Sequence, residues 1–169
     1  MQEVKADQNL VGVFDSGVGG LSVLRVMQET LPAQPLLFFG DQAHVPYGVR
    51  AREEVLGFST EITRFLLAQG AKLIVVACNT ASSAALKSLR KLFPDTPFVG
   101  MEPAVKPAAE QTHSGVVGIL ATYATFQSDV YASVVERFAS GVKVLQNHCP
   151  GLVPEIEKGN LNGAETRRI

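Results

Sequence analysis

The sequence predicts an α/β fold in which a parallel sheet is flanked by helices. Short apolar runs alternate along the chain with longer amphipathic segments, and this alternation implies right-handed strand–helix–strand units. Most of the short runs lack polar alternation, which is typical of strands that helices cover on both faces. Six such strands are expected: Leu10–Phe14, Pro35–Phe39, Leu73–Ala77, Phe98–Met101, Val116–Leu120 and Val142–Leu145.

The expected helices lie between these strands and carry apolar residues at helical spacing. Pro32 stops the first helix, and Gly70 closes the second as a C-terminal cap. The last stretch, Lys158–Ile169, has little apolar content, and we expect it to fray. The four apolar stripes span Leu21–Leu31, Val55–Gln69, Ala81–Leu92 and Phe126–Phe138.

A proline-rich region is the expected boundary between two lobes. Phe93–Pro107 holds four prolines, which favour a linker over a helix or strand. We therefore expect residues 1–97 to form a first α/β lobe. Residues 98–169 are expected to form a second, similar lobe that is incomplete.

Composition excludes several classes of protein. The chain has 169 residues, with 15 Lys and Arg against 16 Asp and Glu, so its formal net charge of −1 argues against a nucleic-acid groove or an anionic membrane as partner. The apolar runs are far shorter than the ~20 residues of a membrane helix. The first ten residues, MQEVKADQNL, are polar, so we predict no signal peptide. Two cysteines without a CxxC pair predict neither a disulfide scaffold nor a metal site.

Ligands of α/β folds gather where strands end in loops, and the first such loop is glycine-rich. Asp15-Ser16-Gly17-Val18-Gly19-Gly20 follows a strand and precedes a helix. Its glycines let backbone N–H groups approach a ligand, so the loop is a candidate anion site. It is not a dinucleotide fingerprint, because Ser22 occupies the place of the third glycine. In the alternative interpretation, Asp15 or Ser16 only caps the helix.

The second loop contains a cysteine. Cys78-Asn79-Thr80 follows the most hydrophobic strand and opens a helix. A thiol in this place faces the positive end of the helix dipole, which favours the thiolate, a nucleophile and a base. Asn79 and Thr80 are suited to hold a carboxylate or an ammonium group. The alternative is that Cys78 is only a small buried apolar residue.

The third loop, Asp41–Gly48, follows the second expected strand. Its Pro46-Tyr47-Gly48 sequence predicts a rigid turn that presents backbone N–H groups or a phenol to a ligand. His44 in the same loop is interpreted as a solvated histidine. Alone, this loop is weak evidence for a site.

Together, the three loops resemble the glutamate racemase family. Asp15-Ser16-Gly17, Pro46-Tyr47-Gly48 and Cys78-Asn79-Thr80 occur in that family's order, each at an expected strand end. Further matches are Thr122–Thr125 and Val153–Gly159, so that the resemblance runs from about Leu10 to Gly159.

The resemblance implies a cofactor-independent amino-acid racemase with two cysteines on opposite faces of the substrate. One thiolate removes the α-proton, and the other thiol returns a proton from the far side. Cys78 matches the first cysteine, and Asp15 matches an acid that assists its proton transfer. Glu157 matches an acid that supports the second base through a histidine. Substrate contacts are implied for Ser16, Pro46, Tyr47, Gly48, Asn79, Thr80, Thr122 and Thr125.

Members of this family make D-glutamate from L-glutamate for peptidoglycan, in the cytoplasm and commonly as dimers. The resemblance therefore implies glutamate as a small-molecule substrate, a homodimer and a cytoplasmic location. It implies no cofactor and no metal, and neither nucleic acid nor membrane as a partner.

The sequence departs from the family pattern at its second catalytic cysteine. In the family this residue lies in a Cys-Thr-His motif downstream of the Glu157 region, and the sequence reaches Ile169 without one. Cys149 lies upstream of that place and is interpreted as a packing cysteine. We therefore expect a truncated racemase that interconverts the enantiomers poorly or not at all alone. Cys78 is still expected to exchange the α-proton of one enantiomer with solvent.

Three alternatives stay open at this point. The first is a non-catalytic module that binds an amino acid, and the second is an aspartate racemase. The third is a cysteine hydrolase in which His44 or His113 serves Cys78 as the base.

Overall fold

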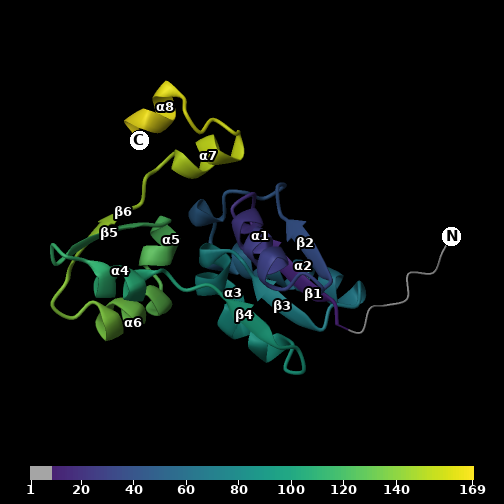
Figure 1. The fold of residues 1–169 in the computed structure, drawn as a ribbon. Helices are drawn as coiled ribbons and strands as arrows, with labels where there is room; N and C mark the ends of the chain where they lie inside the picture. The colour runs from purple at the N-terminus through teal and green to yellow at the C-terminus, as the bar shows by residue number, and fades with distance from the viewer. Residues whose placement is uncertain (1–8) are drawn as a thin grey trace. The chain divides into compact units, whose positions relative to one another are not determined.

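The computed structural model describes residues 9–169, which divide into two compact units with the boundary between Met101 and Glu102 (Figure 1). Residues 1–8, on which most of the signal-peptide prediction depends, lie outside the described residues. Within residues 9–169, no helix combines the length and the apolar character needed to cross a membrane.

The sheet of the first unit consists of β1 (Val11–Asp15), β2 (Leu36–Gly40), β3 (Leu73–Val76) and β4 (Phe98–Gly100). All neighbouring strands pair in parallel, in the order β2-β1-β3-β4. The register places Asp15 opposite Gly40, so the carboxyl ends of β1 and β2 lie at one edge of the sheet. The predicted α/β class with parallel strands is confirmed.

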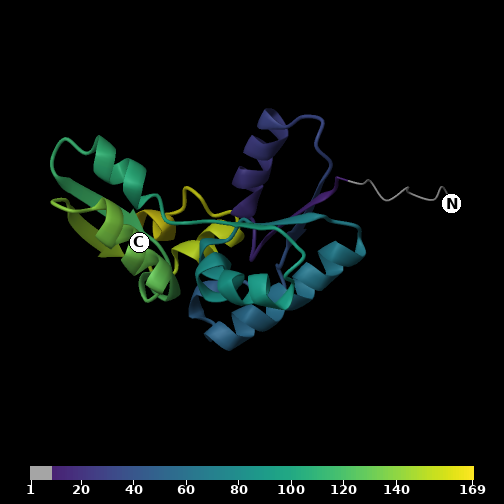
Figure 2. The same cartoon turned by 90° about the horizontal axis from the view of Figure 1, so that it is seen from below.

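Helices cover both faces of this sheet (Figure 2). They are α1 (Gly20–Thr30), α2 (Arg52–Ala68) and α3 (Asn79–Leu92). Because side chains alternate along a strand, Phe14 and Val76 face α2 and α3, while Val13 and Val75 face α1. Gly70 has a φ of +96° just after α2, which confirms its predicted role at the end of that helix.

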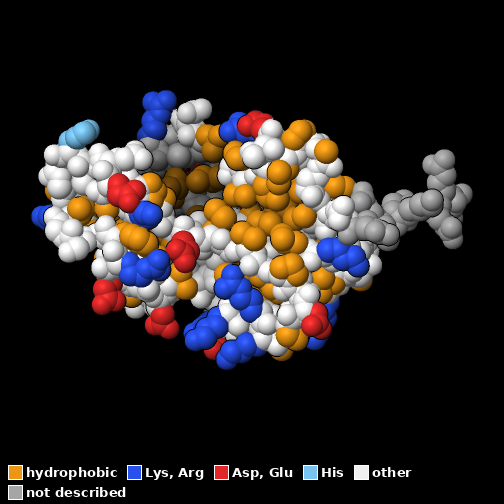
Figure 3. Space-filling model, turned by 60° about the horizontal axis from the view of Figure 1, so that its bottom comes forward, with side chains coloured by type: hydrophobic (Ala, Val, Ile, Leu, Met, Phe, Trp, Pro, Cys, Tyr) orange, Lys and Arg blue, Asp and Glu red, His pale blue; other side chains and the backbone are white. Residues whose placement is uncertain are grey.

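The face that α1 covers retains apolar surface. Leu21 and Val26 of α1, and Leu31 just after it, are about half exposed. Val99 of β4 is opposite Val75 in the register, so it shares this face, and it too is about half exposed. Figure 3 shows hydrophobic side chains gathered at the surface of the first unit.

The strand β4 belongs to the first unit. Phe98 is opposite Ile74 in the parallel register, and Arg90 of α3 donates a hydrogen bond to the Phe98 carbonyl at 3.0 Å. We expected Phe98–Met101 to open the second lobe. The division falls after Met101 instead of after Pro97, because strand pairing outweighs the proline-rich composition.

The second unit has a parallel pair of strands, β5 (Val116–Leu120) and β6 (Lys143–Asn147), which corresponds to the last two expected strands. Its core is formed by Val105, Tyr131 and Val134, against which residues of both strands pack. The helices that supply this core are α4 (Val105–Gln111) and α6 (Asp129–Phe138).

The expected helix over Phe126–Phe138 is wrong at its beginning. The structure has a short helix, α5 (Tyr123–Phe126), and then the separate helix α6. Ser128 Oγ accepts a hydrogen bond from the Tyr131 N–H at 3.1 Å and so caps α6. The apolar spacing continues across this break, which is why periodicity did not reveal it.

The fraying expected for Lys158–Ile169 is also contradicted. After α7 (Leu152–Glu157), the chain forms a second short helix, α8 (Ala164–Arg168). Glu155 accepts hydrogen bonds from Lys158, at 3.0 Å, and from Asn160. Polar contacts thus organise a segment whose low apolar content predicted disorder.

Candidate functional site

The strand-end loops selected from the sequence meet at one edge of the first unit's sheet. The backbone N–H of Asp41 donates to the carbonyl of Asp15 at 3.0 Å, which joins the loops after β2 and β1. Ser16 Oγ lies 3.4 Å from Cys78 Sγ, which joins the loops after β1 and β3. Asp15, Asp41 and Cys78 are each only 6% exposed. The edge therefore combines two buried carboxyl groups with a buried thiol.

Asp15 occupies the N-terminus of α1. Its Oδ2 accepts hydrogen bonds from the N–H groups of Gly17, at 3.2 Å, and Gly20, at 2.8 Å. Two N–H groups of this glycine-rich loop are thus bound by the chain's own carboxylate, which agrees with the alternative in which Asp15 caps the helix. A Cβ at Gly20 would lie 2.5 Å from the Asp15 Cβ, so this position requires glycine.

Cys78 is held at the start of α3, as the sequence predicts. Its Sγ accepts a hydrogen bond from the Ala81 N–H at 3.4 Å. The thiol nevertheless has its pKa raised to about 11, first by burial and then by the negative charge of Asp15. The hydrogen bonds from Ser16 and Ala81 lower this pKa but do not offset the other two effects. The helix end therefore favours the thiolate, as the sequence predicts, but burial and Asp15 outweigh it, so that the net pKa is raised and the group is a thiol at neutral pH.

The two residues that follow Cys78 differ in exposure. Asn79 reaches the surface, whereas Thr80 is buried. Among residues 9–169, the hydrogen bonds to Cys78 Sγ come from Ser16, through its hydroxyl and its backbone, and from the backbone of Ala81, and none of these groups is an imidazole. This arrangement offers no support for the cysteine hydrolase in which His44 would serve as the base.

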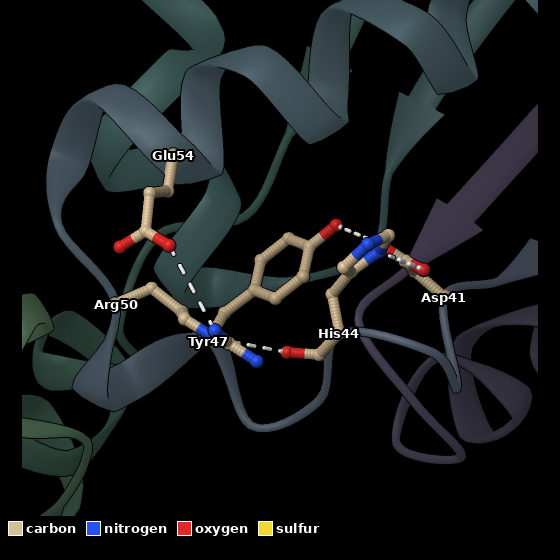
Figure 4. Close-up of polar contacts among 5 residues, drawn as sticks. All are labelled: Asp41, His44, Tyr47, Arg50 and Glu54. Atoms are coloured by element: carbon tan, nitrogen blue, oxygen red, sulfur yellow. Dashed lines mark hydrogen bonds and ion pairs between the residues drawn. The ribbon is translucent and has the colours of Figure 1, made fainter.

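The Pro46–Gly48 turn directs its phenol inward. Tyr47 is 1% exposed, and its hydroxyl donates to Asp41 Oδ2 at 2.6 Å (Figure 4). Burial, followed by the hydrogen bond to the Asp41 carboxylate, raises the pKa of this phenol. The phenol is thus committed to the protein, which leaves the turn's backbone as the part able to contact a ligand.

His44 also binds Asp41. Its Nδ1 lies 2.8 Å from Asp41 Oδ1, and its ring stacks on Phe58 with centroids 4.0 Å apart. His44 is partly solvated, with its side chain 44% exposed, but the sequence did not reveal its contacts with Asp41 and Phe58. Sequence reasoning missed Asp41, although a signal was present: like Asp15, it is an acidic residue at the end of a parallel strand.

The second unit contains the other residues singled out. Thr122 and Thr125 have their hydroxyl oxygens 3.0 Å apart, and Thr122 caps α5 by accepting from the Thr125 N–H at 3.3 Å. Thr125 is 1% exposed. Glu157 is the last residue of α7 and is half-buried.

Cys149 lies in a turn and not in a core. It is partly exposed, its φ is +40°, and its N–H donates to Asn147 Oδ1 at 3.0 Å. The interpretation of Cys149 as a packing cysteine is therefore wrong. Neither Cys78 nor Cys149 forms a disulfide.

A family model and individual relatives identify the same family for this chain. The family model described as Asp/Glu/Hydantoin racemase matches residues 11–169. The chain is 53% identical over 159 residues to a glutamate racemase of Roseiflexus sp. strain RS-1, covering 94% of this chain and 58% of that protein. It is 54% identical over 159 residues to a glutamate racemase of Pseudomonas aeruginosa strain PAO1, covering 94% of this chain and 60% of that protein.

Solved structures agree with these relatives. Escherichia coli glutamate racemase in complex with L-glutamate and the activator UDP-MurNAc-ala matches with a TM-score of 0.84 and 35% identity, over 93% of this chain and 59% of that one. Francisella tularensis glutamate racemase in complex with D-glutamate matches with a TM-score of 0.78 and 31% identity, over 95% and 60%. The chain thus spans about three fifths of the length of these relatives.

Proposed function

The chain belongs to the Asp/Glu/Hydantoin racemase family, and we propose that it carries one half of a glutamate racemase site, in which Cys78 exchanges a proton with the α-carbon of glutamate. The observation that supports this most is the placement of a buried thiol at the start of α3, in contact with the Ser16 hydroxyl and close enough to Asp15 to feel its charge. The E. coli and Francisella structures with L-glutamate and D-glutamate support the choice of substrate.

The proposed chemistry is a proton transfer that needs no redox change. When Cys78 acts as the base, the α C–H bond breaks, an S–H bond forms, and the electron pair stays on the α-carbon. When Cys78 acts as the acid, its S–H bond breaks and the proton adds to that electron pair. Two such groups on opposite faces invert the carbon, whereas one group alone returns the proton to the face it left.

Cys78 is prepared for the acid role, because its raised pKa keeps it protonated at neutral pH. The base role requires a change in its surroundings. The α-ammonium group of a bound amino acid supplies one, since a positive charge near Asp15 offsets the charge that destabilises the thiolate. We therefore propose that Asp15 assists the proton transfer of Cys78.

Other residues receive roles in holding the substrate. Ser16, Asn79 and Thr80 offer hydroxyl and amide groups close to Cys78, and the Pro46–Gly48 turn offers its backbone. For the second unit, we propose that Thr122 and Thr125 contact substrate and that Glu157 supports the second base. These roles follow from the family resemblance.

The test incubates the 169-residue chain with each enantiomer of glutamate and of aspartate in deuterated water. Proton NMR then follows loss of the α-proton signal, and a chiral assay follows interconversion. We expect loss of the α-proton from one glutamate enantiomer, with slow or undetectable interconversion, since these residues include no Cys-Thr-His motif. Faster exchange of aspartate would transfer the assignment to an aspartate racemase. Absence of exchange from all four amino acids would overturn the proposal.

A non-catalytic amino-acid-binding module is the second candidate, because a Cys78 thiol that stays protonated when the ligand is bound cannot remove the α-proton. Calorimetric titration with D-glutamate distinguishes the two. Saturable binding together with α-proton exchange supports the racemase, whereas saturable binding without exchange supports the module.

A further inference from the structure

One buried carboxylate organises the loop after β2. Asp41 receives the Tyr47 hydroxyl at 2.6 Å and His44 Nδ1 at 2.8 Å (Figure 4). Because an ionised carboxylate only accepts, His44 donates through Nδ1. We propose that Asp41 and His44 are positioning residues that fix Tyr47, and with it the Pro46–Gly48 turn, beside Cys78. This inference rests on the proposed function, in which that turn holds the substrate.

Asp41 is itself firmly placed. Its N–H donates to the Asp15 carbonyl at 3.0 Å, and its own carbonyl accepts from the N–H groups of His44 and Val45, each at 3.2 Å. The carboxylate is therefore attached to the end of β1 through its backbone. A group fixed in this way is a suitable anchor for a turn that must keep its position relative to Asp15.

His44 connects the Asp41 carboxylate to α2. Its ring stacks on Phe58 of α2, and its carbonyl accepts from Arg50 Nε at 3.3 Å. The guanidinium of Arg50 lies 3.7 Å from the carboxylate of Glu54, in the first turn of α2. The loop is thus held against α2 at two points, by a ring contact and by a charged side chain.

Tyr47 connects the Asp41 carboxylate to the surroundings of the Cys78 thiol. The ring of Tyr47 belongs to the same core cluster as Cys78, and the negative charges of Asp41 and Asp15 act on its hydroxyl. Tyr47 is also the first residue of a short 3-10 helix, Tyr47–Val49, which includes the end of the Pro46–Gly48 turn. Loss of the hydroxyl's anchor is therefore expected to loosen the turn and to uncover Cys78, which is 6% exposed.

The experiment compares Tyr47→Phe and His44→Gln with wild type and with Thr63→Val. Thr63 is the matched control, because it is a fully buried residue of the same unit whose hydroxyl donates to the Ser59 carbonyl at 2.7 Å. Two readouts are measured: KM and kcat for α-proton exchange of glutamate, and the rate of Cys78 alkylation by iodoacetamide without glutamate. Thermal unfolding establishes that each variant is folded.

Removing either hydrogen bond to Asp41 is expected to raise KM about tenfold while kcat changes by less than about threefold, since a hydrogen bond to a charged group is worth roughly that factor. Cys78 alkylation is expected to become about tenfold faster in both variants. A variant that combines Tyr47→Phe with His44→Gln should have the KM and the alkylation rate of the single variants, because both changes release the same turn. Thr63→Val should change neither readout.

Two results would overturn the inference. One is unchanged KM and unchanged alkylation in folded Tyr47→Phe and His44→Gln. The other is an equal acceleration of alkylation in Thr63→Val, which would indicate general loosening of the unit. If wild type shows no exchange at all, the proposed function fails, and the alkylation rates alone still decide whether Asp41 and His44 position the turn.

Discussion

The hydroxyl of Ser16 lies 3.4 Å from the sulfur of Cys78, although 62 residues separate them in sequence. Parallel pairing of β1 with β3 places the two strand ends side by side and makes this contact. The hydroxyl lowers the pKa of the thiol, while burial and Asp15 raise it. The balance between these effects, together with the hydrogen bond from the Ala81 N–H, decides whether Cys78 is a thiol or a thiolate.

Two substitutions are expected to move the pKa of Cys78 in opposite directions. Asp15→Asn removes a negative charge that disfavours the thiolate, so the pKa should fall below about 11. The amide oxygen of asparagine can still accept from Gly20. Ser16→Ala removes a stabilising hydrogen bond, so the pKa should rise. The rate of alkylation by iodoacetamide, measured against pH, reports both values.

The direction in which the pKa of Cys78 moves in each variant is the critical result of that titration. A rise in Asp15→Asn would mean that the carboxylate stabilises the thiolate, contrary to the charges in the structure. An unchanged profile in Ser16→Ala would mean that the hydroxyl contact has no electrostatic effect on Cys78.

Gly20 is expected to be intolerant of a side chain. Gly20→Ala places a methyl group 2.5 Å from the Asp15 Cβ, which should lower the free energy of unfolding by about 2 kcal/mol. Gly57→Ala is the control, because nothing lies within 4 Å of its Cβ position in α2. That change should raise the free energy by roughly 0.5–1 kcal/mol. Urea unfolding of both variants measures the difference, and similar values for the two would contradict the close approach at Gly20.

Glu155 is expected to titrate at an unusually low pH. Its pKa is lowered from the ordinary 4.5, first by the hydrogen bond from Asn160 and then by that from Lys158. A lowered carboxyl pKa in the folded state contributes stability above the ordinary value, and this stability is lost as the pH falls through the lowered one. Asn160→Ala should raise the pKa of Glu155 toward 4.5, as measured by carbon-13 NMR of the carboxyl group. No change would exclude Asn160 as the main cause.

Periodicity and turn residues predicted most of the framework. Val116–Leu120 was predicted to the residue, and the loops containing Asp15 and Cys78 were placed at strand ends, because buried strands read as short apolar runs. These signals are local. They locate an element along the chain but give no measure of what packs on it.

What the sequence missed depends on tertiary packing. The pKa of Cys78 was expected to fall at a helix end, but burial and Asp15 raise it, and neither effect is visible along the chain. The anchoring of Tyr47 on Asp41 depends on how a turn folds back on a strand end. The separation of α5 from α6 depends on one cap, Ser128, within a continuous apolar stripe.

The central claim is that the sulfur of Cys78 exchanges protons with the α-carbon of glutamate. Cys78→Ala tests it against Cys149→Ala, which removes the chain's other thiol from a partly exposed turn. Both variants are incubated with glutamate in deuterated water, and deuterium at the α-carbon is measured by mass spectrometry. The account predicts that incorporation is lost in Cys78→Ala and stays at the wild-type rate in Cys149→Ala. Undiminished incorporation in Cys78→Ala would contradict it.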